Sequence, residues 1–428
     1  MKKQVFVIGI DPFNAQRLRE IQGADEIDYH CLISYKEAHE KGFGEFEALR
    51  RLGEHRIEEW GITPDAVISW WDYPSTCLAA WFKRQLRLPG ASLESVIHCE
   101  HKYWSRCAHM EVIPENTPQF QALNPFSDNP LNDLEISFPF WIKPVKSVAS
   151  QLALRVTSEK DFFYAIEKMQ HEIHRYGEPF NQALQHITLP PEVMGIDGMW
   201  CIIEKEIATD SQCTLSGYVH NGEVYPYGVV DSINYTHLSS FFRYEYPSRL
   251  PDQVKKRIIS LGTTVMNKLG YDNQAFNIEF YYDKKDDHLW LLEVNPRISQ
   301  SHAECYKRVD GMSNLKVMVD LGLGRKPDVP YRQGDAAVSA KCYFRHFSDG
   351  TVLRAPTREE IERVQEQVSD SIIFWDAPEG VRLSDLKGQD SYSYCLGIVY
   401  LSAGSREELL QKYIRILDSL PYYIEDVK

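Results

Sequence analysis

The chain of 428 residues has no apolar run that reaches the 18 or so residues needed to span a membrane as a helix. The apolar stretch at residues 5–8 follows the first four residues directly and is too short for the core of a signal peptide. Basic residues are also outnumbered, since the formal net charge is −14. Nucleic acids and anionic membranes attract basic surfaces, so we expect neither among the partners.

The cysteines form no regular framework. There are nine of them, an odd number, and no Cys-x-x-Cys pair occurs, which favours reduced thiols and a cytoplasmic location. One segment gathers five soft metal ligands within twelve residues, namely His98, Cys99, His101, Cys107 and His109. Zinc sites show tighter paired spacings separated by a loop, so this segment gives little support for structural zinc.

Two predicted strands joined by a polar turn carry the most informative residues. Alternation along residues 276–282 places Glu279 on the face opposite Phe276, Ile278 and Phe280. Alternation along 290–295 places Glu293 and Asn295 on one face together with Leu291. Residues 283–287 are typical of a turn. Folding the hairpin about that turn brings Glu279 roughly opposite Glu293, with Asn295 one step further on.

Oxygen donors of this kind suit Mg²⁺, which is usually held by one or two carboxylates together with substrate phosphates. Glu279, Glu293 and Asn295 could hold a pair of metal ions that clamp a phosphoryl group. Arg297, just beyond a proline, could then stabilise charge that develops on that group. The alternative is a hairpin whose acidic face is only solvated.

The motifs Phe276-Asn-Ile-Glu-Phe280 and Leu292-Glu-Val-Asn-Pro-Arg-Ile298 resemble the signature of the ATP-grasp superfamily. The resemblance implies two lobes that grip ATP and a carboxylate that takes the γ-phosphate to become an acyl phosphate, which an amine then attacks. It implies ATP and Mg²⁺ as cofactors, with two ions expected and Mn²⁺ as a substitute. Arg297 and Lys143 are the catalytic residues it implies, and Glu279, Glu293 and Asn295 the metal ligands.

The same resemblance assigns an ATP site. Lys102 lies at a helix opening where relatives place a phosphate-binding lysine, and Lys143 ends an apolar strand, where it would contact the α and β phosphates. The remaining positions expected to bind ATP are Gln212 and three residues at the end of an expected strand at 200–207, where relatives bind adenine: Glu204, Lys205 and Ile207. Relatives follow the second lysine with a glycine-rich loop, whereas residues 145–151 contain no glycine, so Ser147 and Ser150 would have to donate hydrogen bonds and Lys146 charge.

The fold class expected is α/β, an ATP-grasp fold with an N-terminal Rossmann-like domain and a C-terminal α+β domain. Apolar runs at 5–8, 28–33 and 66–70 read as parallel strands of residues 1–97. The resemblance places the ATP-grasp domain at 98–330, with its small lobe at about 140–208. Strands at 336–344 and 394–401 and a helix at 405–420 belong to a domain at 331–428.

The reaction expected is a carboxylate–amine ligation that releases ADP and phosphate, with small-molecule substrates. Biotin carboxylases carry a glutamate base where this chain has Ser301, and there is no biotin-attachment segment. The open alternatives are a bicarbonate-using enzyme similar to biotin carboxylase and a non-catalytic ATP-binding module. Arg243, on an expected loop at 231–243, Ser301 and His302 are candidate substrate residues; for Arg243 a surface role, and for His302 a structural role, remain alternatives. A homodimer is expected by analogy with biotin carboxylases.

Overall fold

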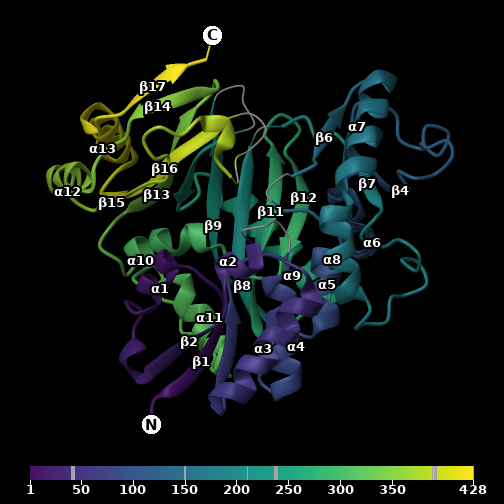
Figure 1. Ribbon diagram of the computed structural model, residues 1–428, viewed down its shortest axis with the longest axis horizontal. Coiled ribbons are helices and arrows are strands. Elements are labelled where there is room, and N and C mark those ends of the chain that lie inside the picture. The colour runs from purple at the N-terminus through teal and green to yellow at the C-terminus, as the bar shows by residue number, and fades with distance from the viewer. Residues whose placement is uncertain are drawn as a thin grey trace.

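Figure 1 shows the protein as a computed structural model, which describes residues 1–39, 44–148, 151–209, 211–235, 240–387, 389 and 393–427. Long strands run through the middle of the molecule, a smaller sheet with its helices lies to the right, and the N-terminal segment lies below. Within the described ranges no helix has both the length and the apolar character required to cross a bilayer.

The N-terminal segment contains a parallel sheet in the order β2-β1-β3. All three predicted strands are present, as β1 (Lys3–Ile10), β2 (Ile27–Ser34) and β3 (Ala66–Ser69). The central strand β1 is buried on both faces, as parallel sheets require. The helices of this segment are α1 (Pro12–Leu18), η1 (Ala24–Glu26), α2 (Tyr35–His39), α3 (Phe46–Trp60), α4 (Ser75–Leu86), α5 (Leu93–Glu100) and α6 (Lys102–Val112).

A four-stranded antiparallel sheet follows in the order β4-β7-β5-β6. It consists of β4 (Phe120–Leu123), β5 (Phe140–Pro144), β6 (Leu154–Val156) and β7 (Cys201–Lys205), preceded by η2 (Pro114–Asn116). The apolar face of α7 (Glu159–Glu172) covers this sheet, with Phe162, Ala165 and Met169 almost fully buried in the same cluster as Phe140 and Ile203. Helix α8 (His174–Leu184) continues from α7.

The central sheet has eight strands in the order β12-β11-β8-β9-β10-β13-β16-β15, all paired antiparallel. Its bounds are β8 (Gln212–His220), β9 (Glu223–Asn234), β10 (Phe241–Tyr246), β11 (Gln274–Asp283), β12 (His288–Asn295), β13 (Val338–His346), β15 (Ser371–Trp375) and β16 (Tyr394–Ala403). β8 and β9 are joined by a tight turn with positive φ at Asn221 and Gly222, as expected of an Asn-Gly hairpin. Helix α9 (Asp252–Lys268) packs on β8 and β9, and η3 (Gln300–His302), α10 (Ala303–Asp310) and α11 (Asn314–Gly322) follow β12.

The predicted C-terminal strands and helix are confirmed, but the strands do not build a sheet of their own. β13, β15 and β16 extend the central sheet. The boundary predicted near residue 330 lies between α11 and β13 in the chain, so strands from both sides of it belong to one hydrogen-bonded sheet. The division into domains stays a prediction. The remaining elements are β14 (Gly350–Arg354), α12 (Arg358–Gln367), η4 (Leu383–Asp385), α13 (Arg406–Ser419) and β17 (Tyr423–Asp426).

Candidate active site

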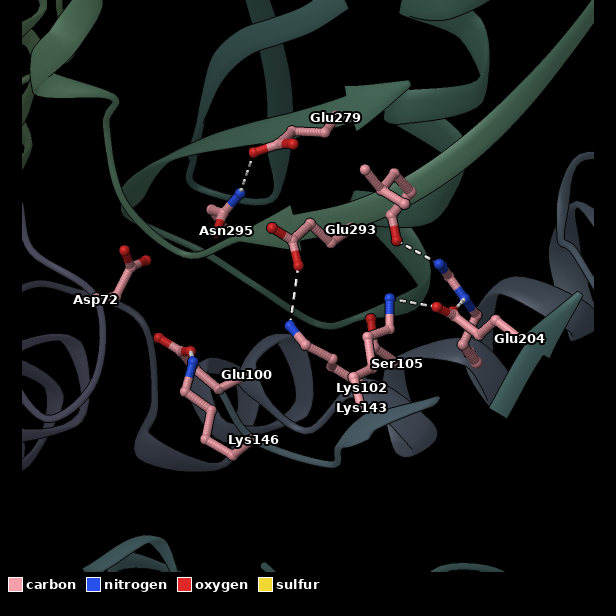
Figure 2. A network of polar contacts seen from close by, with 12 residues as sticks. Asp72, Glu100, Lys102, Ser105, Lys143, Lys146, Glu204, Glu279, Glu293 and Asn295 are labelled. Carbon is pink, nitrogen blue, oxygen red and sulfur yellow. Dashed lines mark hydrogen bonds and ion pairs between the residues drawn. The ribbon is translucent and has the colours of Figure 1, made fainter. Parts of the chain in front are cut away.

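The hairpin of β11 and β12 forms the floor of the candidate site. Its strand register pairs Glu279 with Glu293 and Asn277 with Asn295, as the alternation predicts. The opposite face of β11 points into the core, where Phe276, Ile278 and Phe280 are fully buried. That burial fixes the register, because a slip by one residue would move these aromatic and aliphatic groups into solvent. Figure 2 shows Glu279, Glu293 and Asn295 side by side on one face.

The two carboxyl groups of the hairpin have different acidities. Burial raises the pKa of Glu279 from 4.5 to about 7, and the negative charge of Glu293 adds to the rise. Burial acts in the same direction on Glu293, but the ammonium groups of Lys102 and Lys143 outweigh it and lower the pKa of Glu293 to about 2. One carboxylate is therefore already neutralised by lysine, whereas the other lacks a cation.

Two amide side chains surround the uncompensated carboxylate. Gln212 Nε2 donates to Glu279 Oε2 at 2.8 Å, and Asn295 Nδ2 lies 3.3 Å from Glu279 Oε1. Asn295 Nδ2 also lies 3.1 Å from Asn277 Oδ1. The predicted ligands Glu279, Glu293 and Asn295 are thus in contact or close to one another, and Gln212 lies against them rather than elsewhere in the ATP site.

The donor set fits a hard cation that shares its coordination with phosphate. It offers two carboxylates and one amide, and Mg²⁺ is usually bound by one or two carboxylates together with substrate phosphates. Across the described parts of the chain, no three His, Cys, Asp or Glu side chains converge as a complete cage for a metal. In the His/Cys segment, His98 stacks on Trp104 at 4.1 Å and His101 caps α6 through Trp104 N.

Both predicted phosphate lysines reach this site and contact carboxylates there. Lys102 Nζ, at the start of α6, donates to Glu293 Oε2 at 2.9 Å, and Lys143 Nζ, on β5, pairs with Glu204 on β7. Burial disfavours the charge of Lys102, but Glu293 outweighs it and raises the pKa of that lysine. Burial lowers the pKa of Lys143 despite Glu204. Figure 2 shows these lysines pointing at their partners across the site.

Glu204 is held by a second cation that the sequence did not indicate. Arg106, one α-helical turn after Lys102, donates through Nε to Glu204 and through Nη2 to the carbonyl of Leu292. Although burial opposes ionisation of Glu204, Arg106 and Lys143 lower its pKa to about 2. Arg106 is 3% exposed, so α6 fastens the small sheet to β12 through a buried ion pair.

The other two predicted adenine contacts lie at the end of β7. The backbone N–H of Lys205 already donates to the carbonyl of Gln119, and Lys205 Nζ donates to the carbonyl of Ser137 at 2.9 Å. Ile207 follows the strand and is half-buried. Of the three, Glu204 is engaged through its carboxylate and Lys205 through its N–H, so adenine recognition at this strand end stays a prediction.

Arg297 is held by an aspartate from the N-terminal segment. Its Nε and Nη2 donate to the two oxygens of Asp72 at 2.7 and 2.8 Å, and Nη1 donates to the carbonyl of Ile298 at 3.1 Å. Burial opposes ionisation of Asp72, yet Arg297 keeps its pKa below the ordinary value. Asp72 follows β3, at the carboxyl end of a parallel strand where ligands of α/β sheets bind, but the sequence did not indicate its pairing with Arg297.

The glycine-free segment after β5 is anchored at its start. Lys146 pairs with Glu100 at the end of α5, whose Oε1 accepts from Thr76 Oγ1 at 2.6 Å, and all three side chains are at least 94% buried. Lys146 is therefore engaged in a buried ion pair and is not free to add charge to a phosphate loop. Ser147 is buried, and Ser150 lies outside the described residues.

The candidate substrate residues fall in two places. The expected loop at 231–243 is wrong at its described ends, because residues 231–234 complete β9 and 241–243 begin β10. Arg243 is 5% exposed, and its Nε donates to Glu245 at 2.9 Å, which contradicts the surface alternative and leaves its guanidinium paired with protein. Ser301 and His302 lie in η3, a few residues beyond Arg297.

Comparison with known sequences finds similarity in the segment around the hairpin. A family model described as the ATP-binding domain of the carbamoyl-phosphate synthase L chain matches residues 244–328. The carbamoyl phosphate synthase large chain of Mycobacterium tuberculosis is 29% identical over 107 residues, which is 25% of this chain and 9% of that protein. The large chain of Streptomyces griseus gives 29% over 108 residues, again 25% and 9%. The match spans about a tenth of the length of these relatives.

Comparison with solved structures extends over the whole chain. An L-amino acid ligase from Bacillus licheniformis superposes with a TM-score of 0.71 at 17% identity, covering 100% of this chain and 99% of that one. A biotin carboxylase from Campylobacter jejuni gives 0.64 at 14% identity, covering 100% and 93%. The N5-carboxyaminoimidazole ribonucleotide synthetase of Thermotoga maritima gives 0.62 at 13%, covering 99% and 100%. The fold class expected from the sequence is confirmed, since the chain has the ATP-grasp fold of these solved structures.

Proposed function

We propose that the protein is an ATP-dependent carboxylate–amine ligase that forms an amide or peptide bond through an acyl phosphate and releases ADP and phosphate. The observation that carries the proposal is the acidic hairpin face of Glu279 and Glu293, bordered by Lys102 on one side and by Arg297 on the other. Opposite charges arranged around one space suit the transfer of a phosphoryl group, for which alignment and charge compensation do most of the work.

Glu279, Glu293 and Asn295 would hold Mg²⁺, with two ions or Mn²⁺ as further proposals. Mg²⁺ held by these residues would supply positive charge beside the phosphates of ATP. The site residues fit this role because Glu279 forms no ion pair among the described residues. Burial and the charge of Glu293 therefore raise its pKa to about 7. A carboxylate that is costly to ionise by itself is stabilised when a cation binds beside it.

Lys102 and Lys143 would bind the phosphates of ATP by exchanging partners. Each now pairs with a carboxylate, Lys102 with Glu293 and Lys143 with Glu204. Glu204 retains Arg106 when Lys143 turns to phosphate, so the buried carboxylate is not left without a cation. Glu293 would lose its ion pair with Lys102 in the same way and would be one of the residues that hold Mg²⁺. The lysines are therefore kept in place without nucleotide and remain available to it.

Arg297 would stabilise the transferring phosphoryl group and the acyl phosphate. A guanidinium has five N–H donors, and three of them serve Asp72 and Ile298. Two remain for phosphate oxygens, while the bidentate contact with Asp72 fixes the plane of the group. The carboxylate substrate would attack the γ-phosphate beside Arg297, and the amine would then displace phosphate from the acyl carbon. Exclusion of water protects that intermediate from hydrolysis.

The experiment is a measurement of ADP and phosphate release with Mg-ATP, using pooled amino acids and small carboxylic acids, with and without bicarbonate. We expect release that requires both a carboxylate and an amine and that disappears in Glu293→Gln. The matched control is Asp286→Asn, the same carboxylate-to-amide change at the exposed turn of the same hairpin, which should leave release unchanged.

Two other results would replace the proposal. Release driven by bicarbonate without an amine would favour the enzyme similar to biotin carboxylase. ATP binding with no release from any pool would favour the non-catalytic module. A homodimer and a cytoplasmic location are further proposals, the first testable by sedimentation and the second by fractionation of cells that produce the protein.

A further inference from the structure

His302 is a buried histidine with two unpartnered nitrogens. The residue is 1% exposed, and neither Nδ1 nor Nε2 has a hydrogen-bond partner among the described residues. Burial and the positive charges of Lys341 and Arg297 lower the pKa of His302 to about 3. The ring is therefore neutral at physiological pH, with one N–H donor and one acceptor, and it is too weak a base to take a proton from an ammonium group.

Lys341, on β13, brings an ammonium group without an acidic partner in the described part of the chain to Ser301, the residue before His302. Its Nζ donates to Ser301 Oγ at 2.9 Å and lies 5.0 Å from the centre of the Tyr343 ring and 5.9 Å from that of Tyr400. No carboxylate among the described residues lies within 4 Å of this ammonium. Burial raises the pKa of Asp376 and the charge of Lys341 opposes that rise, but these two groups form no ion pair.

The cluster borders the phosphoryl-transfer site. The Tyr244 ring lies 5.1 Å from the His302 ring and 6.0 Å from the Tyr343 ring, in edge-to-face arrangements. Burial raises the pKa of the Tyr244 hydroxyl, the charge of Glu279 adds to this rise and the charge of Arg297 opposes it. η3 connects the two places in sequence, since Ser301 and His302 follow Arg297 by four and five residues.

The missing partner has a defined chemistry. A buried N–H without an acceptor destabilises the folded protein, and a half-buried ammonium that contacts a hydroxyl and two aromatic rings but no carboxylate is incompletely neutralised. A water molecule would satisfy the ring nitrogen, but it would not neutralise Lys341. A carboxylate does both, because it accepts from the N–H and carries the opposite charge.

We propose that Lys341 and His302 bind the carboxylate of the amine substrate, so that the second substrate is an amino acid or another amine that carries a carboxyl group. The inference rests on the proposed function and specifies its acceptor. Lys341 neutralises the carboxylate, Ser301 orients the ammonium, and His302 donates its N–H. The amino group is thereby directed toward the acyl phosphate at Arg297.

The test compares free amino acids with their methyl esters, which lack the negative charge. ADP release is measured with Mg-ATP and a fixed carboxylate substrate from the pooled screen, and KM and kcat are obtained for each amine. We expect the wild type to have a KM about 10- to 100-fold lower for the acid than for its ester, the range expected for one charge-assisted hydrogen bond. This comparison needs no variant.

Lys341→Met should raise KM for the acid by the same factor and leave KM for the ester unchanged, whereas Lys341→Arg should keep most of the preference. The control is Lys412→Met on α13, whose side chain is 15% exposed and whose Nζ donates to the carbonyl of Ser402. Equal KM for acid and ester in the wild type, or an equal effect of Lys341→Met on both, would overturn the inference while ADP release continued. Absence of release with every pool would overturn the proposed function itself.

Discussion

Replacing Glu279 by Gln should make the nucleotide-free protein more stable while abolishing its activity. In the folded state burial and Glu293 raise the pKa of Glu279 from 4.5 to about 7. The folded protein therefore binds more protons than the unfolded chain between these values. Stability falls as the pH rises through this window, and the full penalty remains above pH 7.

The expected gain follows from that difference. A rise from 4.5 to about 7 corresponds to about 3 kcal/mol. Part of it is offset, because the carboxylate accepts from Gln212 and lies near the amide nitrogen of Asn295, and a glutamine side chain satisfies one of these donors at most. An offset of about 1 kcal/mol, together with screening of a partly exposed group, leaves a gain of about 1–2 kcal/mol at about pH 8.

The assay is urea unfolding of wild type and Glu279→Gln, followed by tryptophan fluorescence between about pH 5 and pH 8 with EDTA present. The variant should have the higher midpoint at pH 8, and the difference should shrink as the pH falls toward 5. A variant that is less stable than wild type at pH 8, or a difference that does not change with pH, would refute the reasoning. Mg-ATP should stabilise the wild type and not the variant.

Three further outcomes follow from the packing and charges. Glu245 is fully buried among three arginines, which outweigh its desolvation and lower its pKa to about 2. The stability that Glu245 contributes is therefore present above pH 4.5 and is lost as the pH falls from 4.5 toward 2. The thermal unfolding temperature of Glu245→Gln should vary less with pH in this range than that of the wild type, and an equal pH dependence of the two would contradict this. Phe276→Ala should lower the free energy of unfolding by about 3–5 kcal/mol, against about 0.5 kcal/mol or less for the 54% exposed Phe163→Ala, as urea titration would show, and equal losses would contradict the core assignment. Lys102→Met should weaken ADP binding about 10- to 100-fold in calorimetry, and unchanged affinity would exclude it from the phosphate site.

The acidic hairpin was predictable because it is local. Its strands are close in sequence, and the period of two alone assigns Phe276, Ile278 and Phe280 to the core and Glu279 to the other face. A short turn then leaves one register that buries these side chains. The register next to the turn would pair Glu279 with Leu292, and a β-bulge beyond Phe280, which the pattern does not show, brings Glu279 opposite Glu293.

The charges that complete the site come from distant segments. Asp72 lies 225 residues from Arg297, and Arg106 lies 98 residues from Glu204. Periodicity gives the face of a side chain on its own element, but not which other element packs there. Arg106 could have been suspected, since α6 places it on the same side as Lys102 one turn earlier. Lys341 carried no motif at all.

The loop expected at 231–243 was wrong at both described ends for a physical reason. Its polar residues Asp231 and Arg243 are buried with partners: Asp231 accepts from the backbone N–H of Arg249, and Arg243 pairs with Glu245. A polar residue buried with a partner looks in the sequence like a polar residue in a loop. The extension of the central sheet by β13 is also non-local, since it requires β10 as a neighbour.

The most direct test of an acyl-phosphate ligase is to trap the activated carboxylate. The protein is incubated with Mg-ATP and the carboxylate substrate, with hydroxylamine replacing the amine, and the hydroxamate is quantified against ADP. The account predicts hydroxamate in amounts equal to the ADP released, dependent on the carboxylate, absent in Glu293→Gln and retained in Asp286→Asn. Amide formation from the natural amine, with ADP release but without any hydroxamate, would contradict an acyl phosphate as the intermediate.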